Sequence, residues 1–502
     1  MELLHNLAIG FGVALTLTNL WYAFIGCLLG TLIGVLPGIG PLATIAMLLP
    51  VTFTLNPTSA LIMLAGIYYG AQYGGSTTAI LVNIPGETSS AITTLDGYQM
   101  ARQGRAGPAL GIAAIGSFIA GSLATLVIAV AAPPLAEVAL KFGPAEYFSL
   151  MVLGLVGAVV LAHGSVLKAI AMIILGLLFG LVGTDVNSGV ARFSFGVSEL
   201  TDGLGFVGIA MGMFGYGEII LNLEKGQETE EVFTAKVGKL LPSWDEFKYC
   251  TPSIIRGTVL GSLLGILPGG GALLAAFAAY AVEKKLTKDR EKFGEGNIRG
   301  VAGPESANNA GAQTSFIPML TLGIPSNAIM ALMIGAMMIQ GIAPGPQVMT
   351  ERPQLFWGMI ASMWVGNAML VVLNLPLVGM WIKLLTIPYR ILFPSILLFC
   401  TIGVYSVQNS AFDSILTALF GLFGYICVKT ESEPAPMLLG YILGPLMEEN
   451  LRRAMLLSRG DPIVFFQRPI SAVMLVLAIL LLLIIVLPNV RKKREEAFVE
   501  ED

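Results

Sequence analysis

Long apolar segments, separated by short polar ones, make up most of the chain. Since one membrane-spanning helix takes about 20 apolar residues, the pattern predicts an all-α polytopic membrane protein with roughly 12 transmembrane helices. Some segments contain Pro-Gly breaks and others are too short to cross alone. We therefore expect broken or re-entrant helices, which a membrane tolerates only where they are buried or line a cavity. The apolar segments are 7–36, 41–55, 58–84, 109–132, 147–162, 166–184, 203–222, 252–282, 312–342, 355–376, 377–404, 412–428, 434–447 and 470–488.

The composition excludes an ordinary soluble enzyme. Only 12% of the 502 residues are charged and 55% are hydrophobic, whereas soluble proteins carry about 25% charged residues. The net charge of −4 provides no basic field that would attract nucleic acid. The sequence contains no CxxC, HExxH or phosphate-loop motif, so we expect no transition-metal site and no cofactor. Residues 1–6 lack a basic leader region and read as part of the mature chain.

Two polar stretches, 223–250 and 283–299, interrupt the apolar pattern with charged residues of both signs. Both are typical of solvated connecting loops. We interpret the first as the connection between two membrane halves. The predicted organisation is a first half at 1–222, a connecting segment at 223–250, a second half at 251–488 and a charged cytoplasmic tail at 489–502.

The strongest signal in the sequence is an internal repeat. Each copy has glycines at every fourth position, which places them on one stripe of a helix where two backbones can approach closely. Each stripe ends in Leu-Pro-Gly, where proline removes a donor and glycine allows the chain to unwind. The two sets, 231 positions apart, are Gly26, Gly30, Gly34 and Gly38, and Gly257, Gly261, Gly265 and Gly269.

A second pair of motifs follows in the same order. The run Asn-Ile-Pro-Gly-Glu at 83–87 is echoed 240 positions later by Gly-Ile-Pro-Ser-Asn at 323–327. The dipeptide Gln-Gly at 103–104 then recurs at 340–341. The order and spacing indicate a two-fold duplication with a broken helix at each motif. The duplicated regions are 20–110 and 251–350.

Charge placement indicates that the two copies are inverted. The second copy runs from Leu-Pro-Gly into the basic loop 284–299, whereas the matching first-copy stretch 51–57 carries no charge. After the Ile-Pro motif the bias reverses, because only the first copy continues directly to Arg102 and Arg105. Basic loops prefer the cytoplasm, so equivalent ends are predicted to face opposite sides. Arginines at 452–468 conflict with a cytoplasmic tail, but acidic residues accompany them, so we assign the tail to the cytoplasm.

Inverted repeats with matched broken helices are typical of the site of a secondary transporter. Neither 70–95 nor 302–345 contains Lys or Arg, so an anionic substrate would rely on helix N-termini, hydroxyls and side-chain amides. Unwound carbonyls at the Leu-Pro-Gly segments would suit Na⁺. Glu87 and Glu305 are candidates for contacting substrate or cation, because charged groups at membrane depth are costly. The alternative is that the hydroxyls only hold helices together.

The candidate residues fall into two groups. The predicted substrate-binding residues are Ser76, Thr77, Thr78, Asn83, Pro85, Gly86, Glu87, Asn308, Asn309, Thr314, Ser315, Pro325, Ser326 and Asn327. The predicted cation-binding residues are Pro37, Gly38, Gly40, Pro268, Gly269, Gly271 and Glu305.

Several motifs together carry a family resemblance. They are Gly34–Pro41, Tyr68–Gly70, Gly74–Ala79, Asn83–Glu87, Leu95–Tyr98, Arg105–Gly111, Leu267–Gly271, Pro304–Asn309 and Ile317–Pro325. As a set, they resemble the large permease subunit (TctA-type) of the tripartite tricarboxylate transporter family, with a likeness from about residue 5 to 490.

This resemblance implies a multi-pass permease of the bacterial inner membrane. Such a permease works with a small membrane subunit and a periplasmic solute-binding protein. It imports carboxylates, which are tricarboxylates or related organic acids. The transport is by cation symport and alternating access. The coupling ion would be Na⁺ or H⁺. The departures Gly311–Ser315 and Ser326-Asn327 lie beside the predicted site, so the resemblance does not name the carboxylate.

Two other classes of function remain open at this stage. One alternative is a passive channel or facilitator for small organic anions. A ring of charges along a pore would favour this class, and the sequence contains no such ring. An intramembrane enzyme needs a nucleophile and a base in reach of each other. The chain has only two histidines and no metal-binding motif, so we expect no enzyme. A Ser-Lys pair remains open as a route to such chemistry.

Overall fold

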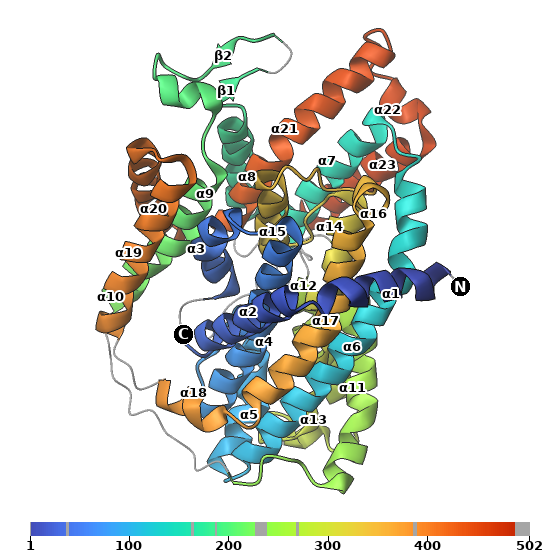
Figure 1. Cartoon of the computed structure of the whole chain (residues 1–502). Helices are drawn as coiled ribbons and strands as arrows, with labels where there is room; N and C mark the ends of the chain where they lie inside the picture. Colours follow the sequence, from blue (N-terminus) through green and yellow to red (C-terminus); the bar gives the residue numbers. More distant parts are fainter. Residues whose placement is uncertain are drawn as a thin grey trace.

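The computed structural model describes residues 2–36, 40–161, 165–185, 188–225, 238–267, 271–384 and 389–486. It is 80% helical. The strands of this described part are β1 (Gly183–Thr184) and β2 (Ala191–Arg192), which pair antiparallel as a small hairpin at the upper end of the molecule in Figure 1. The predicted all-α class is therefore confirmed.

The helices of the first half precede residue 226. They are α1 (Glu2–Ala14), α2 (Leu17–Val35), α3 (Pro41–Phe53), α4 (Pro57–Val82), the 3-10 helix η1 (Thr88–Ser90), α5 (Ala91–Arg102), α6 (Ala106–Ala139), α7 (Pro144–Leu161), α8 (Val166–Gly180), the 3-10 helix η2 (Ser198–Asp202), α9 (Phe206–Ala210), the π-helix η3 (Met211–Tyr216) and α10 (Gly217–Lys225).

The second half begins with α11 at Trp244, inside the segment that the sequence assigned to the connection. Its helices are α11 (Trp244–Leu264), α12 (Gly271–Leu286), the 3-10 helix η4 (Arg290–Lys292), α13 (Arg299–Thr314), α14 (Phe316–Leu322), α15 (Ala328–Ile339), α16 (Gln347–Glu351), α17 (Pro353–Asn374), α18 (Val378–Leu384), α19 (Tyr389–Gln408), α20 (Ala411–Lys429), α21 (Pro434–Leu457), α22 (Val464–Gln467) and α23 (Pro469–Val486).

Four described helices, α2, α6, α17 and α20, are long and apolar enough to cross a membrane. Six shorter apolar helical stretches accompany them, among them α3, α7, α8, α15 and α23. The chain is therefore a multi-pass membrane protein. The 26-residue helix α4 carries more polar side chains than these helices do, and nearly all of its residues are buried inside the protein. Roughly 12 transmembrane helices stays a prediction.

The predicted glycine stripes are sites of close helix packing. A Cβ atom built on Gly26, Gly30 or Gly34 of α2 would lie only 2.2–2.4 Å from a backbone carbonyl oxygen of α4. In the second copy, a Cβ on the matching glycines of α11 would lie 2.3–2.4 Å from α13. Glycine is required at these positions because no side chain fits between the backbones. The accepting carbonyls belong to Met63, Ile67 and Ala71 in α4, and to Gly303, Ala307 and Gly311 in α13.

The helices end at the predicted Pro-Gly motifs. In the first copy, α2 ends at Val35 and α3 starts at Pro41. In the second copy, α11 ends at Leu264 and α12 starts at Gly271. The second motif separates α4 from η1 and α5 in the first copy, and α14 from α15 in the second. The duplicated pattern of broken helices therefore exists in both regions.

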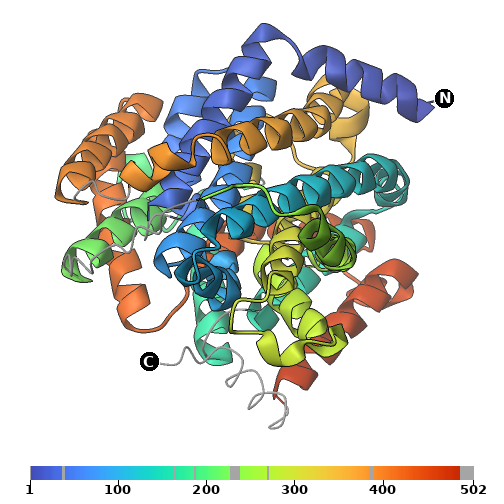
Figure 2. The same cartoon turned by 90° about the horizontal axis from the view of Figure 1, so that it is seen from below.

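The two copies pack across each other. Helix α3 of the first copy contacts α15 of the second, while α12 of the second copy contacts η1 and α5 of the first. The helices that follow also cross over, since α6 packs on α13 and α17 packs on α4. Figure 2 shows α6, in cyan, alongside the yellow-green helices of the second copy. These first-copy contacts of the described helices thus have second-copy counterparts.

Two glutamines tie the far ends of these crossed helices together. Gln103, at the C-terminal cap of α5, donates a hydrogen bond of 2.7 Å to the carbonyl oxygen of Glu295, in the loop after α12. Gln340, at the matching cap of α15, donates one of 2.8 Å to the carbonyl oxygen of Thr52, near the end of α3. The ends of α5 and α12 therefore lie together, as do the ends of α3 and α15.

The polar stretch 283–299 is not the simple solvated loop that its charges predicted. Glu283 and Asn297 are buried. The carboxylate of Asp96, which is fully buried in α5, accepts three backbone hydrogen bonds of 2.8–2.9 Å from this stretch. The loop is thereby fixed against the first copy, because three N–H groups, two of them buried, depend on one side chain. The three donors are the amides of Gly294, Gly296 and Asn297.

Candidate functional site

The first-copy break begins where Asn83 ends α4 in a left-handed conformation, with φ of 60°. Pro85 follows and has no N–H with which to continue the helix. A Cβ on Gly86 would lie 2.0 Å from the carbonyl oxygen of Gly34 in α2. Only glycine therefore fits where the backbone of the break approaches α2. Asn83 and Pro85 are exposed, whereas Gly86 and Glu87 are buried. The break therefore projects the Glu87 side chain inward.

The second-copy break has the same plan with different side chains. Gly323 ends α14 in the left-handed region, with φ of 72°. The side chain of Asn327 caps α15 by accepting a bond of 2.9 Å from the Met330 amide. Gly271, the first residue of α12, lies so close that an added Cβ would be 3.2 Å from the Asn327 amide nitrogen. Pro325 is buried, unlike Pro85. The two breaks thus share a backbone path but differ in exposure.

Glu305 of α13 joins the two copies. One carboxylate oxygen accepts a hydrogen bond of 2.5 Å from the hydroxyl of Ser76 in α4, and the other accepts one from Thr93 in α5. Its backbone carbonyl accepts from Asn309 at 3.1 Å and from Ser117 of α6 at 3.5 Å. Glu305 is 1% exposed. A second-copy carboxylate is therefore held entirely by groups that the first half supplies.

Glu87 makes the reciprocal connection. Its carboxylate accepts hydrogen bonds from the hydroxyl of Ser89 and, at 3.1 Å, from the side-chain amide of Asn308 in α13. Ser89 also lies 3.1 Å from the side-chain oxygen of Gln72. Among the described residues, the ion pairs include neither Glu87 nor Glu305. Two buried acids thus stand where the copies meet, without a basic partner in that part of the chain.

Other predicted substrate residues point to helix interfaces. The hydroxyl of Thr78 lies 3.0 Å from the carbonyl oxygen of Val35 in α2. In the second copy, the hydroxyl of Ser315 lies 3.3 Å from the carbonyl oxygen of Gly265, the C-terminal cap of α11. These contacts hold each glycine-striped helix to its partner, as the packing alternative describes. Thr314 contacts the carbonyl of Gly261 in the same way, and Ser326 contacts that of Ser315.

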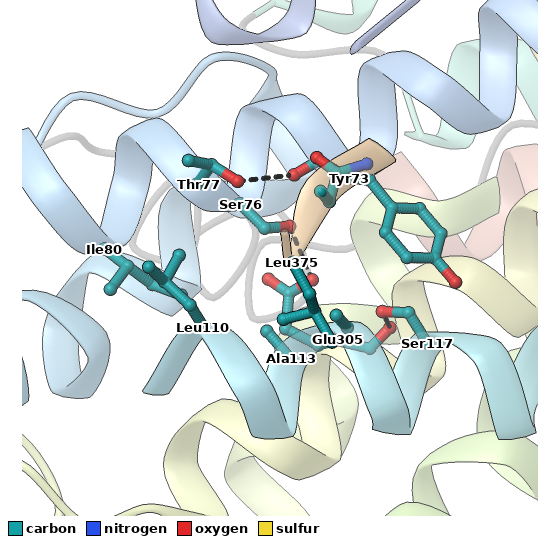
Figure 3. A pocket seen from close by; sticks show the side chains of 11 residues that line it. Tyr73, Ser76, Thr77, Ile80, Leu110, Ala113, Ser117, Glu305 and Leu375 are labelled. Carbon is teal, nitrogen blue, oxygen red and sulfur yellow. Dashed lines mark hydrogen bonds between the residues drawn. The ribbon is translucent and has the colours of Figure 1, made fainter. Parts of the chain in front are cut away.

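A small cavity lies beside Glu305, between α4, α6, α13 and the end of α17 (Figure 3). Its volume is about 10 Å³, which is about the space that one water molecule needs. A tricarboxylate therefore does not fit in this cavity. The lining residues are Tyr73, Ser76, Thr77, Ile80, Leu110, Ala113, Ala114, Ser117, Glu305, Asn374 and Leu375.

Several polar residues at this site were missed in the sequence. Thr93 lies in α5, outside the duplicated motifs, and Ser117 and Asn374 lie in long apolar helices. A signal was present, because Ser117 and Asn374 are polar residues within stretches expected to face lipid or core. Single hydroxyls and amides are common in membrane helices as packing groups, so this signal does not distinguish a site from an interface.

Only some of the predicted cation-binding residues lie within the described part of the chain. Pro37, Gly38, Pro268 and Gly269 lie outside the described residues. Gly40 is half-buried, and Gly271 and Glu305 are buried. Among the described residues, no group of three or more His, Cys, Asp or Glu side chains gathers in a way that would hold a metal ion.

The comparisons with known proteins include one family match. The family model described as "Tripartite tricarboxylate transporter TctA family" matches residues 20–439. The chain is 59% identical over 502 residues to an uncharacterized 52.8 kDa protein in the TAR-I ttuC' 3' region of Agrobacterium vitis, with 100% of both chains covered. An uncharacterized protein in the TAR-II ttuC' 3' region of Agrobacterium vitis is 59% identical over 242 residues, which are 48% of this chain and 100% of that one. No solved structure matches the chain.

Proposed function

Because the chain belongs to the tripartite tricarboxylate transporter TctA family, we propose that it is the large permease subunit of a carboxylate importer. It works by cation symport and alternating access, in the bacterial inner membrane. Its partners are a small membrane subunit and a periplasmic solute-binding protein, and the coupling ion is Na⁺ or H⁺. Its role is transport and not catalysis, which fits a family of transporters.

One observation carries this proposal. Helices of both copies meet at two buried carboxylates, with Ser76 of α4 and Thr93 of α5 on Glu305 and Asn308 of α13 on Glu87. A buried acid without a basic partner is unfavourable in a membrane protein unless it serves a function. A site between two repeats, built from broken helices, is where secondary transporters bind substrate and coupling ion.

Inverted repeats account for the crossed packing. The ends of α5 and α12 lie together, as do those of α3 and α15, through the Gln103 and Gln340 hydrogen bonds. An arrangement in which the second copy is turned over relative to the first produces such an exchange of partners. The sequence supports the same orientation, since basic residues follow α5 and α12 and basic loops prefer the cytoplasm.

The substrate would be an anion held without basic side chains. The N-terminus of α15, capped by Asn327, and the N-terminus of η1 and α5 supply the positive end of a helix dipole. Asn308 and Asn309 supply side-chain amides from α13. Carboxylates accept such bonds well. The small cavity and the unequal exposure of Pro85 and Pro325 fit a closed state from which one side must open.

Reconstitution tests this proposal. The chain is placed in liposomes with its membrane partner, and uptake of labelled carboxylates is measured with the periplasmic binding protein added or omitted. We expect saturable uptake that requires both the binding protein and an inward Na⁺ or H⁺ gradient. Uptake that is unsaturable and independent of any gradient would instead identify a channel or facilitator.

A matched pair of variants ties the activity to the site. Asn308→Ala removes the amide that contacts Glu87, and Asn450→Ala removes one that bonds only to the carbonyl of Leu446 in α21. We expect uptake to fall several-fold in Asn308→Ala and to stay at the wild-type level in Asn450→Ala. Equal uptake by both variants would remove Asn308 from the transport site.

A further inference from the structure

One arm of the chain presents large apolar side chains to its surroundings. This hairpin arm, residues 188–203, contains β2 and leads toward α9. Phe195 is 85% exposed, and Val190, Phe193 and Val197 are exposed as well. The arm projects from the upper end of the molecule, beyond the end of α8 (Figure 1). Neighbouring exposed apolar side chains of this kind mark a surface that another molecule covers.

The backbone of the arm holds its two aromatic rings in an unfavourable conformation. Phe193 and Phe195 have φ of 52° and 50°. This left-handed region is uncommon for a bulky residue, and residues held in it concentrate at functional sites. The fold therefore presents both rings outward although a conformation with negative φ would be more favourable for each.

Four charged side chains fix the base of the arm to α21. Arg192 lies 2.8 Å from Glu448 and 3.8 Å from Asp185, while Arg452 lies 2.6 Å from Glu448 and 2.8 Å from Asp185. Each charge thus has two neighbours of the opposite sign. A network of several charges contributes more than a single exposed pair does. The arm is therefore held in a defined position on the helices below it.

The arm lies on the side of the membrane opposite to the basic loops. The chain enters α6 directly after Arg105, at the end that the basic residues of α5 mark as cytoplasmic. It then passes through α6, α7 and α8, and three successive crossings bring it to the other face. Figure 1 agrees, since α5 lies toward the lower end of the molecule and the arm at the upper end. In an inner-membrane permease this face is the periplasmic one.

The charge of the arm favours a protein over a lipid surface as the occupant. Elements that lie on membranes use Lys and Arg to attract anionic headgroups, but the basic residue of the arm, Arg192, is paired with acids. Glu199 and Asp202 are exposed, and the ion pairs of the described residues include neither. Aromatic rings beside two acids complement a protein face with an apolar pocket and basic residues at its rim.

The arm is also connected to the second-copy break. Directly after it, the carbonyl of Leu204 accepts a hydrogen bond from Tyr441 of α21, and the ring of Phe206 in α9 stacks on that of Tyr441. The Phe206 ring also lies against α15, since a Cβ on Gly335 would be 2.1 Å from it. Helix α15 is the one that Asn327 caps at the break. A displacement of the arm therefore acts on this helix through one aromatic ring.

We propose that the hairpin arm is the docking surface for the periplasmic solute-binding protein. Phe193 and Phe195 enter an apolar pocket of that protein, while Glu199 and Asp202 face basic side chains around the pocket. Docking acts on the second-copy break through Phe206 and α15. This inference rests on the proposed function and adds the surface at which its periplasmic partner binds.

Binding of the solute-binding protein to the purified full-length chain in lipid nanodiscs tests this surface. The probe is the purified binding protein that supports carboxylate uptake in liposomes. Phe195→Ser removes one proposed anchor. Phe466→Ser is the matched control, because Phe466 is an exposed ring of α22, beyond the end of α21 that holds the arm. We expect affinity to fall at least about tenfold in Phe195→Ser, as for other aromatic anchors, and to be unchanged in Phe466→Ser. Thermal unfolding in detergent checks that both variants are folded.

Two further variants examine the charges of the arm and its link to α15. Glu199→Lys combined with Asp202→Lys should slow association several-fold at low salt, because like charges then face each other. Association as fast as that of the wild-type chain would contradict the charge complementarity. Phe206→Ala should keep the docking affinity but lower uptake several-fold, since the arm is intact while its contact with α15 is lost. Wild-type uptake in Phe206→Ala would overturn the link to the break.

A dye that reports polarity, attached to Phe195→Cys, identifies the occupant. The cysteines of the chain itself are buried, so the dye reacts at the arm. We expect its emission to shift to the blue only when the binding protein is added to the nanodiscs. A blue shift in lipid alone would show that the arm inserts into the membrane, and would overturn the inference.

The outcomes separate the docking surface from the proposed function. Equal affinity of Phe195→Ser and Phe466→Ser for the binding protein would overturn the surface. So would loss of a dimer of the chain in Phe195→Ser without a change in that affinity, because a second copy would then be the occupant. In both cases, uptake that still required the binding protein would leave the proposed function in place. Wild-type uptake that needed no binding protein would overturn both.

Discussion

Asn83 and Gly323, which are 240 positions apart, end two matched helices in the same left-handed conformation, with φ of 60° and 72°. Each is followed by Ile-Pro. Two residues later the chain is extended, at Glu87 with φ of −147° and at Asn327 with φ of −154°. The same backbone path thus occurs twice, although its side chains have diverged from an acid to an amide.

This shared conformation separates the backbone role of Asn83 from its side-chain role. Asn83→Gly keeps a residue that tolerates positive φ, so we expect thermal stability to be retained while uptake of carboxylate falls several-fold. Asn83→Leu should in addition destabilise the fold by about 1–2 kcal/mol, since a branched side chain disfavours this region. Thermal unfolding in detergent and uptake in liposomes are the two measurements. Wild-type uptake in Asn83→Gly would remove its amide from the transport site.

The sequence was informative about the fold wherever a backbone requirement dictated the residue type. The glycines of α2 and α11 lie where a Cβ would collide with a carbonyl, and Pro85 and Pro325 lie where helices stop. Such requirements leave a visible pattern, because only Gly or Pro satisfies them. The duplication could therefore be detected before any contact was known.

The partners of the polar side chains could not be predicted in the same way. Ser76 and Thr78 are two residues apart in α4, yet one contacts Glu305 and the other contacts the carbonyl of Val35. Which direction a hydroxyl faces depends on the rotation of the whole helix and on its neighbours. Sequence similarity between the two copies therefore indicated a site, but not which of its hydroxyls face a cavity.

Long-range contacts also explain the error at 283–299. The charged residues there are typical of a solvated loop, but Asp96 of α5 holds the loop by three amides and Tyr280 donates a further bond of 2.9 Å. Asp96 and its donors are about 200 residues apart, with separations of 198, 200 and 201 positions. No local pattern in either segment indicates the other.

Removal of the Asp96 carboxylate should loosen this loop specifically. Asp96→Ala leaves the buried N–H groups of Gly296 and Asn297 without this partner, at about 1–3 kcal/mol each, so we expect a loss of stability of at least about 2 kcal/mol. Tyr280→Phe removes only one hydroxyl and should cost about 1 kcal/mol. Hydrogen–deuterium exchange at the amides of Gly294, Gly296 and Asn297 measures the effect. Unchanged exchange in Asp96→Ala would show that the loop does not depend on this carboxylate.

The glycine stripes should be sensitive to a single methyl group. Gly30→Ala and Gly261→Ala each place a Cβ within 2.3 Å of an opposing carbonyl oxygen, so the helix pairs must separate. We expect a loss of about 1–3 kcal/mol for each variant, as for other overpacked interiors. Gly12→Ala in α1 is the control, because a Cβ there meets nothing within 4 Å. Because Ala is a better helix former than Gly, helix propensity alone should not destabilise any of these variants, and a control as unstable as either stripe variant would show that close packing does not explain the loss.

Acid should weaken the contact between α6 and α11. Arg105 donates a hydrogen bond of 2.7 Å to Glu246 at the polar start of α11, and the Ser243 amide donates one of 2.8 Å. Burial raises the pKa of Glu246, but the hydrogen bonds from Ser243 and Arg105 outweigh it and hold this pKa below its usual value. The ionised form is therefore favoured by folding.

The sign of the pH dependence follows from this lowered pKa. The stabilisation is complete above the unfolded-state pKa of about 4.3 and disappears as pH falls through the lower folded value. Glu246→Gln should reduce stability at neutral pH and should flatten the acid-induced decline in thermal unfolding. Asp245→Asn, on the adjacent residue, controls for the loss of one charge. The same acid-induced decline in Glu246→Gln and in the wild-type chain would contradict this account.

The ion pair between Arg256 and Glu283 should show strong non-additivity. Glu283 is 1% exposed and accepts two bonds of 2.6 and 2.7 Å from Arg256, as well as one of 2.6 Å from Ser253. Arg256→Met leaves a buried carboxylate without its counter-charge, which should cost about 3 kcal/mol or more. The double variant with Glu283→Leu removes both charges and fills the space with apolar atoms. Because desolvation opposes the attraction between buried charges, the double variant should be more stable than Arg256→Met alone. Thermal unfolding of the wild-type chain, Arg256→Met, Glu283→Leu and the double variant decides. Costs that simply add would mean that the pair is solvated rather than buried.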